Sequence, residues 1–158
     1  MTRVGIGYDV HRVAQGRRLV LCGVEFPGEI GLDGHSDADV ALHAVADALL
    51  GAAALGDIGE HFPPADERWR DVDSGDLLTR IVAIIAPDYN IGNVDLTLVG
   101  ERPRVAPRRE AMRQRLAELL GIDIERVSVK ATTNERLGAI GRGEGIAALA
   151  SALLEERR

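Results

Sequence analysis

The sequence predicts a two-layer α+β sandwich. Segments with alternating apolar residues indicate strands, and longer segments rich in Ala and Leu indicate helices. In a doubly wound sheet the two kinds of segment would alternate along the chain. Here the candidate strands at 3–8 and 18–22 both precede the first candidate helix. The order therefore favours helices packed on a single sheet over a doubly wound fold.

Composition restricts the class of protein. The 158 residues, 46% hydrophobic and 28% charged, suit one globular domain over residues 1–158. The net charge of −6 argues against a nucleic-acid-binding surface, which would be basic. The start MTRVGIGYDV is unlike a signal peptide, and no uncharged apolar run is long enough for a membrane span. With Cys22 as the single cysteine no internal disulfide can form, and we expect a cytoplasmic protein.

The first half of the chain contains three candidate strands and one candidate helix. The strands are at 3–8, 18–22 and 24–26, and a loop rich in Gly and Asp follows at 28–39. The helix formers of VALHAVADALLGAAA predict a helix that begins at Val40. Its expected N-cap is Asp37 or Asp39, and its expected stop is Gly56.

The second half begins with a polar segment at 56–75. Its Gly residues and Pro-Pro pair predict a long loop, a length typical of functional or disordered segments. After it we expect a helix at 74–86 with Ser74 as cap, a strand at 91–101, a helix at 107–120 and a strand at 126–133. The last segment, EGIAALASALLEERR, is helical by propensity, although alternation from Ile146 to Leu154 also suits a strand.

Asp9 and His11 are the first candidate functional pair. Two residues apart on a strand, they share a face, and a lone pair of this kind is most simply a surface feature. His43 on the first helix adds a third donor, although it also reads as a core histidine satisfied by Asp39 or Asp47. One carboxylate and two imidazoles suit Zn²⁺ with an open coordination position. Asp39 or Asp47 would then hydrogen-bond to a zinc-binding histidine.

Three further segments suit anions, each with a simpler alternative. GHSDAD at 34–39 offers N–H groups and a hydroxyl at a helix start, or it only caps the helix. KATTNERLGAIGRGEG at 130–145 offers hydroxyls, a carboxylate and Arg142 in a Gly-rich turn suited to phosphates and a Mg²⁺-type ion, or it is a charged turn. RPRVAPRR at 102–109 is typical of a phosphate or nucleotide patch or, more often, of a solvated helix entrance. His35, Ser36 and Asp57 lack the G-x-S-x-G elbow of a nucleophile triad.

Four segments together resemble a known family. They are GYDVH, LDGHSDADVALHAVADALLGAAALGDIGEHFP, GNVDLTLV and VKATTNERLGAIGRGEGIA, in this order. They are similar to the 2-C-methyl-D-erythritol 2,4-cyclodiphosphate synthase family of the non-mevalonate isoprenoid pathway. The resemblance implies attack of the 2-phosphate of 4-diphosphocytidyl-2-C-methyl-D-erythritol 2-phosphate on its β-phosphate, with release of CMP. Such a cyclising phosphorus–oxygen lyase relies on positioning and charge neutralisation, without a protein nucleophile.

The resemblance also implies roles for individual residues. Asp9, His11 and His43 match zinc ligands, and Glu135 matches the ligand of a Mg²⁺ or Mn²⁺ ion between the phosphates. His35 and Thr133 match the pair that stabilises the transition state. The positions that match substrate contacts are Ser36, Asp57, Ile58, Gly59, Phe62, Asp66, Gly100, Arg104, Val105, Ala106, Thr132 and Asn134, with the cytidine held by the 100–106 segment.

The implied assembly is a homotrimer with active sites between subunits. Ala139, Arg142 and Glu144 match positions at the threefold axis, where a central cavity can hold an isoprenoid diphosphate. The family has a strand at the C-terminal segment, so we predict a strand there. The implied fold is then a mixed four-stranded sheet with helices on one face. Neither a nucleic acid nor a membrane is an expected partner.

Two positions depart from the family pattern. Pro64 stands where an aspartate is frequent, which stiffens the loop and leaves contact with the erythritol hydroxyls to Asp66. Ala139 stands where phenylalanine is frequent, which narrows the apolar wall of the axial cavity. Two rival functions remain open. One is a non-catalytic trimeric module that senses isoprenoid diphosphates, and the other is a zinc hydrolase that yields a linear product.

Overall fold

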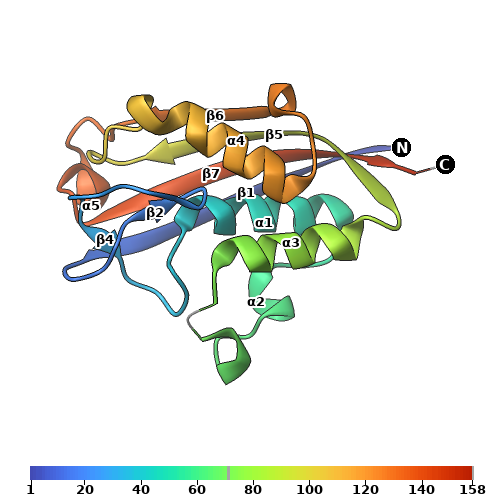
Figure 1. Cartoon of the computed structure of the whole chain (residues 1–158), viewed down its shortest axis with the longest axis horizontal. Coiled ribbons are helices and arrows are strands. Elements are labelled where there is room, and N and C mark those ends of the chain that lie inside the picture. Colours follow the sequence, from blue (N-terminus) through green and yellow to red (C-terminus); the bar gives the residue numbers. More distant parts are fainter. Residues whose placement is uncertain (71, 158) are drawn as a thin grey trace.

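The computed structural model describes residues 1–70 and 72–157, so Asp71 of the predicted loop and Arg158 of the C-terminal segment lie outside the described residues. A mixed sheet in the order β4-β1-β7-β5-β6 forms the centre of the molecule (Figure 1). Its strands are β1 (Thr2–Ala14), β4 (Gly31–Leu32), β5 (Tyr89–Val99), β6 (Val127–Thr132) and β7 (Gly145–Glu156). β5 and β6 are parallel, whereas the other neighbouring pairs are antiparallel.

The sheet has five strands, so the predicted count of four is wrong. The additional strand, β4, lies inside the predicted loop at 28–39 and pairs with the end of β1. Two residues are too few to show an alternating pattern, so no sequence signal marks this strand. The predicted strands at 18–22 and 24–26 shrink to β2 (Val20–Leu21) and β3 (Val24–Glu25), which form a separate hairpin-like sheet.

β7 occupies the central position of the sheet, which confirms the predicted C-terminal strand. Its residues pair with β1 on one side and with β5 on the other. The alternating residues Ile146, Ala148, Ala150, Ala152 and Leu154 are buried. Pairing on both edges provides hydrogen-bond partners along most of the strand, and this outweighs the helical propensity of Ala and Leu.

The helices cover one face of the sheet (Figure 1). They are α1 (Val40–Ala53), α3 (Ser74–Ile85) and α4 (Arg109–Leu120). The single-turn helices α2 (Ile58–His61) and α5 (Gly138–Gly141) and the 3₁₀ turns at Glu67–Trp69, Ala106–Arg108 and Ile124–Arg126 lie in the connecting segments. α1 lies directly against β1, because a Cβ at Gly5 or Gly7 would stand 1.9 Å from a carbonyl oxygen of α1. These two glycines therefore set how closely α1 approaches the strand.

Several predicted helix ends are corrected. Of the two candidates for the N-cap of α1, the structure selects Asp39, whose side chain accepts from the backbone N–H of Leu42. The helix ends at Ala53, before the predicted stop at Gly56. Asp73 caps α3 through the N–H of Gly75, so Ser74 is not the cap. The predicted loop at 56–75 contains α2 and a 3₁₀ turn, because Asp57 and Asp66 cap them with their side chains.

The other face of the sheet is open in the single chain. Val4, Ile6, Tyr8 and Val10 of β1 point to this side and are 66%, 75%, 57% and 47% exposed. Together with Leu149 of β7 they form the apolar patch that we call the open face. Among the described helices, none has both the length and the apolar character that crossing a bilayer requires.

Candidate functional site

Asp9, His11 and His43 converge at the side of the sheet that α1 covers. β1 extends to Ala14 and presents Asp9 and His11 on the same face, while α1 brings His43 across from the helix layer. Asp9 Oδ2 lies 2.9 Å from His11 Nε2 and 3.1 Å from His43 Nδ1. The two imidazole nitrogens lie 3.3 Å apart. These three residues could hold a metal ion, because their donor atoms lie within 4.8 Å of one another.

The outer nitrogens of both histidines also have partners. His11 Nδ1 faces the backbone carbonyl of Asp33 at 2.5 Å, so this nitrogen donates and Nε2 keeps its lone pair for the cluster. His43 Nε2 lies 2.9 Å from Ser74 Oγ, whose hydroxyl donates to the carboxylate of Asp37. Such outer contacts fix the tautomer and ring orientation of histidines that bind metals. The donor set therefore fits a Zn²⁺ ion, with both imidazoles turned to one point.

The carboxylate partner of His43 differs from the expectation. Asp39 accepts from the backbone N–H groups of Cys22 and Gly23, and Asp47 accepts from that of Ile58. Within the described residues neither of these two carboxylates hydrogen-bonds to the His43 imidazole. Burial raises the pKa of Asp39 to about 7 and also raises the pKa of Asp47. Asp37 takes the expected role instead, acting through Ser74.

The electrostatics of the triad favour an ionised Asp9. Burial by itself would raise the pKa of this carboxyl, but hydrogen bonds with His11 and His43 lower it to about 2. The hydrogen bond with Asp9 raises the pKa of His11, against the effect of its burial. Without a metal the cluster therefore favours a protonated His11, and a divalent cation would replace that proton.

Other predicted site residues lie near the triad. Ser36 is 8% exposed, and its hydroxyl lies 3.3 Å from His43 Nε2. Arg17 donates to the carbonyl oxygens of Gly34 and Ser36 and so holds the segment that carries the exposed His35. Asp57, Ile58 and Gly59 lie at the start of α2, close to the end of α1.

The loop after α2 is organised around aromatic side chains. Phe62 and Trp69 meet edge to face, with ring centroids 4.9 Å apart, and the guanidinium of Arg80 lies over the Trp69 ring. Asp66 is bound by Arg68, with 2.6 Å between Arg68 Nη2 and Asp66 Oδ2. Asp66 is the carboxylate expected to contact the erythritol hydroxyls, because Pro64 stands where a second one is frequent. Its contact with Arg68 therefore holds it within the loop itself.

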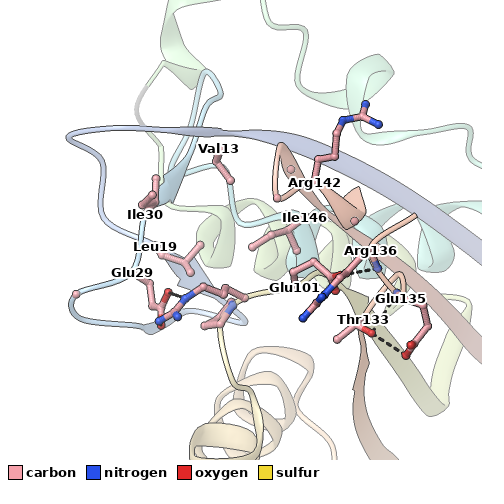
Figure 2. A pocket seen from close by; sticks show the side chains of 16 residues that line it. Val13, Leu19, Glu29, Ile30, Glu101, Thr133, Glu135, Arg136, Arg142 and Ile146 are labelled. Atoms are coloured by element: carbon pink, nitrogen blue, oxygen red, sulfur yellow. Dashed lines mark hydrogen bonds and ion pairs between the residues drawn. The ribbon is translucent and has the colours of Figure 1, made fainter. Parts of the chain in front are cut away.

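A second group of predicted residues surrounds a cavity of about 1200 Å³. Figure 2 shows Thr133, Glu135 and Arg136 on one side of this cavity and Leu19 and Glu29 on the other. Thr133 Oγ1 donates to Glu135 Oε1 at 3.0 Å. Hydroxyl, carboxylate and guanidinium groups on a cavity wall suit a phosphate and a hard cation.

The predicted cytidine segment borders the same region. Gly100, Val105 and Thr132 line a small neighbouring pocket, and Val105 is buried while Arg104 is exposed beside a further groove. Ala106 begins the 3₁₀ turn that leads into α4. The segment starts where β5 ends, next to the end of the parallel strand β6, so it lies beside Asn134 and the turn that follows β6.

The predicted axial residues form a separate short turn. Arg142 Nε donates to Glu144 Oε1 at 3.0 Å, and Ala139 is exposed at the start of this turn. None of Asp9, His11 and His43 lines the large cavity, and no described hydrogen bond joins the triad to Thr133 or Glu135. A single chain thus carries two half-sites, one with a metal-binding donor set and one with a phosphate-type cavity.

Sequence reasoning missed four residues of these half-sites. Asp33 acts through its backbone carbonyl, and the sequence predicts only helix capping for Asp37 and Ser74. Glu101, whose carboxylate accepts from backbone N–H groups of the 133–136 turn, lies in the predicted cytidine segment but has no predicted role of its own. Each acts across a long separation in sequence, so no local pattern could have revealed it.

Comparison with known proteins confirms the resemblance noted in the sequence. A family model described as the YgbB family matches residues 2–155. The 2-C-methyl-D-erythritol 2,4-cyclodiphosphate synthase of Symbiobacterium thermophilum is 58% identical over 155 residues, which cover 98% of this chain and 99% of that protein. A bifunctional enzyme IspD/IspF from an Anaeromyxobacter species is 59% identical, and the match covers 96% of this chain but 39% of that protein.

Solved structures agree in fold. A 2C-methyl-D-erythritol-2,4-cyclodiphosphate synthase in its CDP-bound form superimposes with a TM-score of 0.89 and 38% identity, over 97% of this chain and 100% of that one. The bifunctional IspDF from Campylobacter jejuni has a TM-score of 0.96 at 39% identity, and the match covers 99% of this chain and 43% of that chain.

Proposed function

This chain belongs to the YgbB family, and we propose from that premise that it converts 4-diphosphocytidyl-2-C-methyl-D-erythritol 2-phosphate to 2-C-methyl-D-erythritol 2,4-cyclodiphosphate with release of CMP. An oxygen of the 2-phosphate attacks the β-phosphorus, and the bond from that phosphorus to the bridging oxygen of CMP breaks. The observation that carries the proposal is the convergence of Asp9, His11 and His43, in a chain similar to such a synthase over 98% of its length. We place the enzyme in the cytoplasm as a single domain over residues 1–158.

Two metal ions are part of the proposal. Zn²⁺ would be held by Asp9 Oδ2, His11 Nε2 and His43 Nδ1, and Mg²⁺ or Mn²⁺ by Glu135 together with substrate phosphates. When bound, these ions supply positive charge to phosphate oxygens. This assignment explains why the sites offer carboxylates, imidazoles and hydroxyls without a nucleophile.

The protein groups position the reacting phosphates. His35 and Thr133 donate hydrogen bonds to phosphate oxygens that gain charge as the new P–O bond forms. Ser36, Asp57, Ile58, Gly59, Phe62 and Asp66 contact the erythritol end. The cytidine end is held by Gly100, Arg104, Val105 and Ala106, with Thr132 and Asn134 beside the diphosphate.

The complete active site forms between subunits of a homotrimer. This assembly would join the metal half-site of one chain to the phosphate cavity of its neighbour, which a single chain does not do. The open face supports the proposal, because a contiguous exposed apolar patch is typical of an interaction surface. At the axis, Arg142 and Glu144 would surround a central cavity able to hold an isoprenoid diphosphate, with Ala139 as its narrower apolar wall.

The direct test is to incubate the pure protein with the cytidyl substrate and Mg²⁺ and to measure CMP. We expect CMP and a cyclic product by phosphorus NMR, both lost after the metals are stripped and restored when they are returned. His43→Ala should lose both zinc and activity. No CMP above the metal-stripped sample would refute the proposal.

The two rival functions predict different results. A zinc hydrolase would give a linear bisphosphate, whose two phosphorus signals lack the coupling through a P–O–P bridge that the cyclic diphosphate shows. A sensing module would bind an isoprenoid diphosphate without turnover, and its binding would survive replacement of Asp9 or His11. The observed donor set of the triad favours the lyase over the sensing module, because binding at the axis has no need of it.

A further inference from the structure

Glu101 connects the two loops that leave the carboxyl ends of β5 and β6. The strands are parallel neighbours, and Gly100 N donates to the carbonyl of Thr132 at 3.0 Å. Glu101 is the next residue, and its side chain crosses to the other loop. Its Oε1 accepts from Arg136 N at 2.7 Å, and its Oε2 accepts from Asn134 N at 3.3 Å. Figure 2 shows Glu101 beside Arg136 at the wall of the large cavity.

The turn that Glu101 binds has an unfavourable backbone. Glu135 and Arg136 have φ angles of 50° and 60°, in the left-handed region that residues with a Cβ rarely occupy. Two such residues in succession persist only where surrounding contacts fix them. The turn therefore depends on its hydrogen bonds to keep its shape.

Those hydrogen bonds come mostly from side chains. The hydroxyl of Thr133 accepts from Glu135 N at 3.2 Å, and the amide of Asn134 donates to the carbonyl of Leu137. Glu101 is the one described partner from outside the turn that binds its N–H groups with a charged side chain. Hydrogen bonds to a carboxylate are stronger than those between neutral groups, so Glu101 is the main external anchor.

The packing around Arg136 leaves no room for the turn to move inward. A Cβ on Gly141 would lie 2.2 Å from the Arg136 carbonyl carbon, so α5 touches the turn from its other side. Loss of Glu101 would therefore free the turn to move only away from Gly141. That movement would carry Thr133 and Glu135 with it.

We propose that Glu101 is a positioning residue that fixes the 133–136 turn. It thereby holds the Thr133 hydroxyl and the Glu135 carboxylate at a set distance from the cytidine segment. This inference rests on the proposed function, which places the phosphates at the turn and cytidine at 100–106. One substrate molecule spans both loops, so a tie between them sets the distance from nucleoside to phosphates. Misplacement of a positioned group by about 1 Å can cost about 100-fold in rate.

The test compares Glu101→Ala and Glu101→Gln with Glu118→Gln as control, which removes an exposed glutamate on α4. We expect kcat to fall about 10- to 100-fold in Glu101→Ala. The Mg²⁺ concentration for half-maximal rate should rise in that variant, because Glu135 is displaced. Glu101→Gln keeps one acceptor oxygen and should lie between Glu101→Ala and the wild type, while Glu118→Gln should match the wild type.

Hydrogen exchange gives a readout that does not need turnover. The Arg136 amide should exchange slowly in the wild type and at least 10-fold faster in Glu101→Ala and Glu101→Gln, with core amides of β7 unchanged. Unaltered Arg136 exchange, or a wild-type kcat and Mg²⁺ dependence in Glu101→Gln and Glu101→Ala, overturns the inference while the proposed function stands. A wild-type enzyme that releases no CMP refutes the proposed function instead, whatever the exchange shows.

Discussion

Ser74 is the first residue of α3, yet its hydroxyl lies between His43 and Asp37 instead of capping the helix. We predict that Ser74→Ala weakens zinc binding about 10- to 100-fold, because His43 loses the contact that orients its ring. Competition with a chromophoric chelator measures this affinity. Ser128→Ala, an exposed serine on β6, serves as the matched control. Equal zinc affinities of the two variants would show that Ser74 does not orient His43.

Asp9 makes the metal-free protein sensitive to acid. Its pKa is about 2 in the folded chain and 3.8 ordinarily, so its stabilisation is complete above pH 3.8 and is lost as the pH falls toward 2. The loss amounts to about 2 kcal/mol. Urea unfolding of metal-free wild type and Asp9→Asn at several acidic pH values isolates this contribution. The two stability curves should converge as the pH falls, and curves that stay parallel would exclude it.

At the scale of elements, β1 and α1 can approach so closely only because the contact is made by glycines, which have no side chain. A Cβ at Gly7 would lie 1.9 Å from the Ala44 carbonyl oxygen, so we expect Gly7→Ala to destabilise the fold by about 1–3 kcal/mol. Gly51 of α1 has its nearest such neighbour at 4.0 Å, and Gly51→Ala should stabilise the helix by about 0.5–1 kcal/mol. Chemical denaturation measures both. If the two substitutions changed the free energy of unfolding in the same direction, the role assigned to this contact would be wrong.

The elements also show how far the sequence predicts this molecule. The alternation of Val94, Leu96 and Leu98 predicted β5, and all three are buried on one face. β7 was predictable only from the family resemblance. Its Ala-rich sequence also suits a helix, and the two strands that pair with it come from distant segments. The triad was predictable from residue types and helix position. Glu101 and the His43–Ser74–Asp37 chain were not, because hydrogen bonds between distant segments leave no periodic pattern.

At the scale of the whole molecule, the open face predicts self-association. Ile6 is 75% exposed on that face, whereas Ile84, 41% exposed, lies on α3 in the helix layer. We expect the wild type to sediment at about three times the 16.9 kDa chain mass, and Ile6→Glu to sediment as single chains without activity. A buried charge in a subunit interface is strongly unfavourable. Ile84→Glu should remain trimeric, and a trimeric Ile6→Glu would place the interface elsewhere.

The central place of β7 also has a consequence during translation. β7 separates β1 from β5, and of the five described strands of the sheet it is the last to leave the ribosome. Until residues 145–156 have been made, β1 has no main partner, and its apolar side chains stay exposed beside an unpaired edge. Unpaired edges of this kind make nascent chains prone to aggregate and to need chaperones. The sheet thus closes only after residues 145–156 have been synthesised.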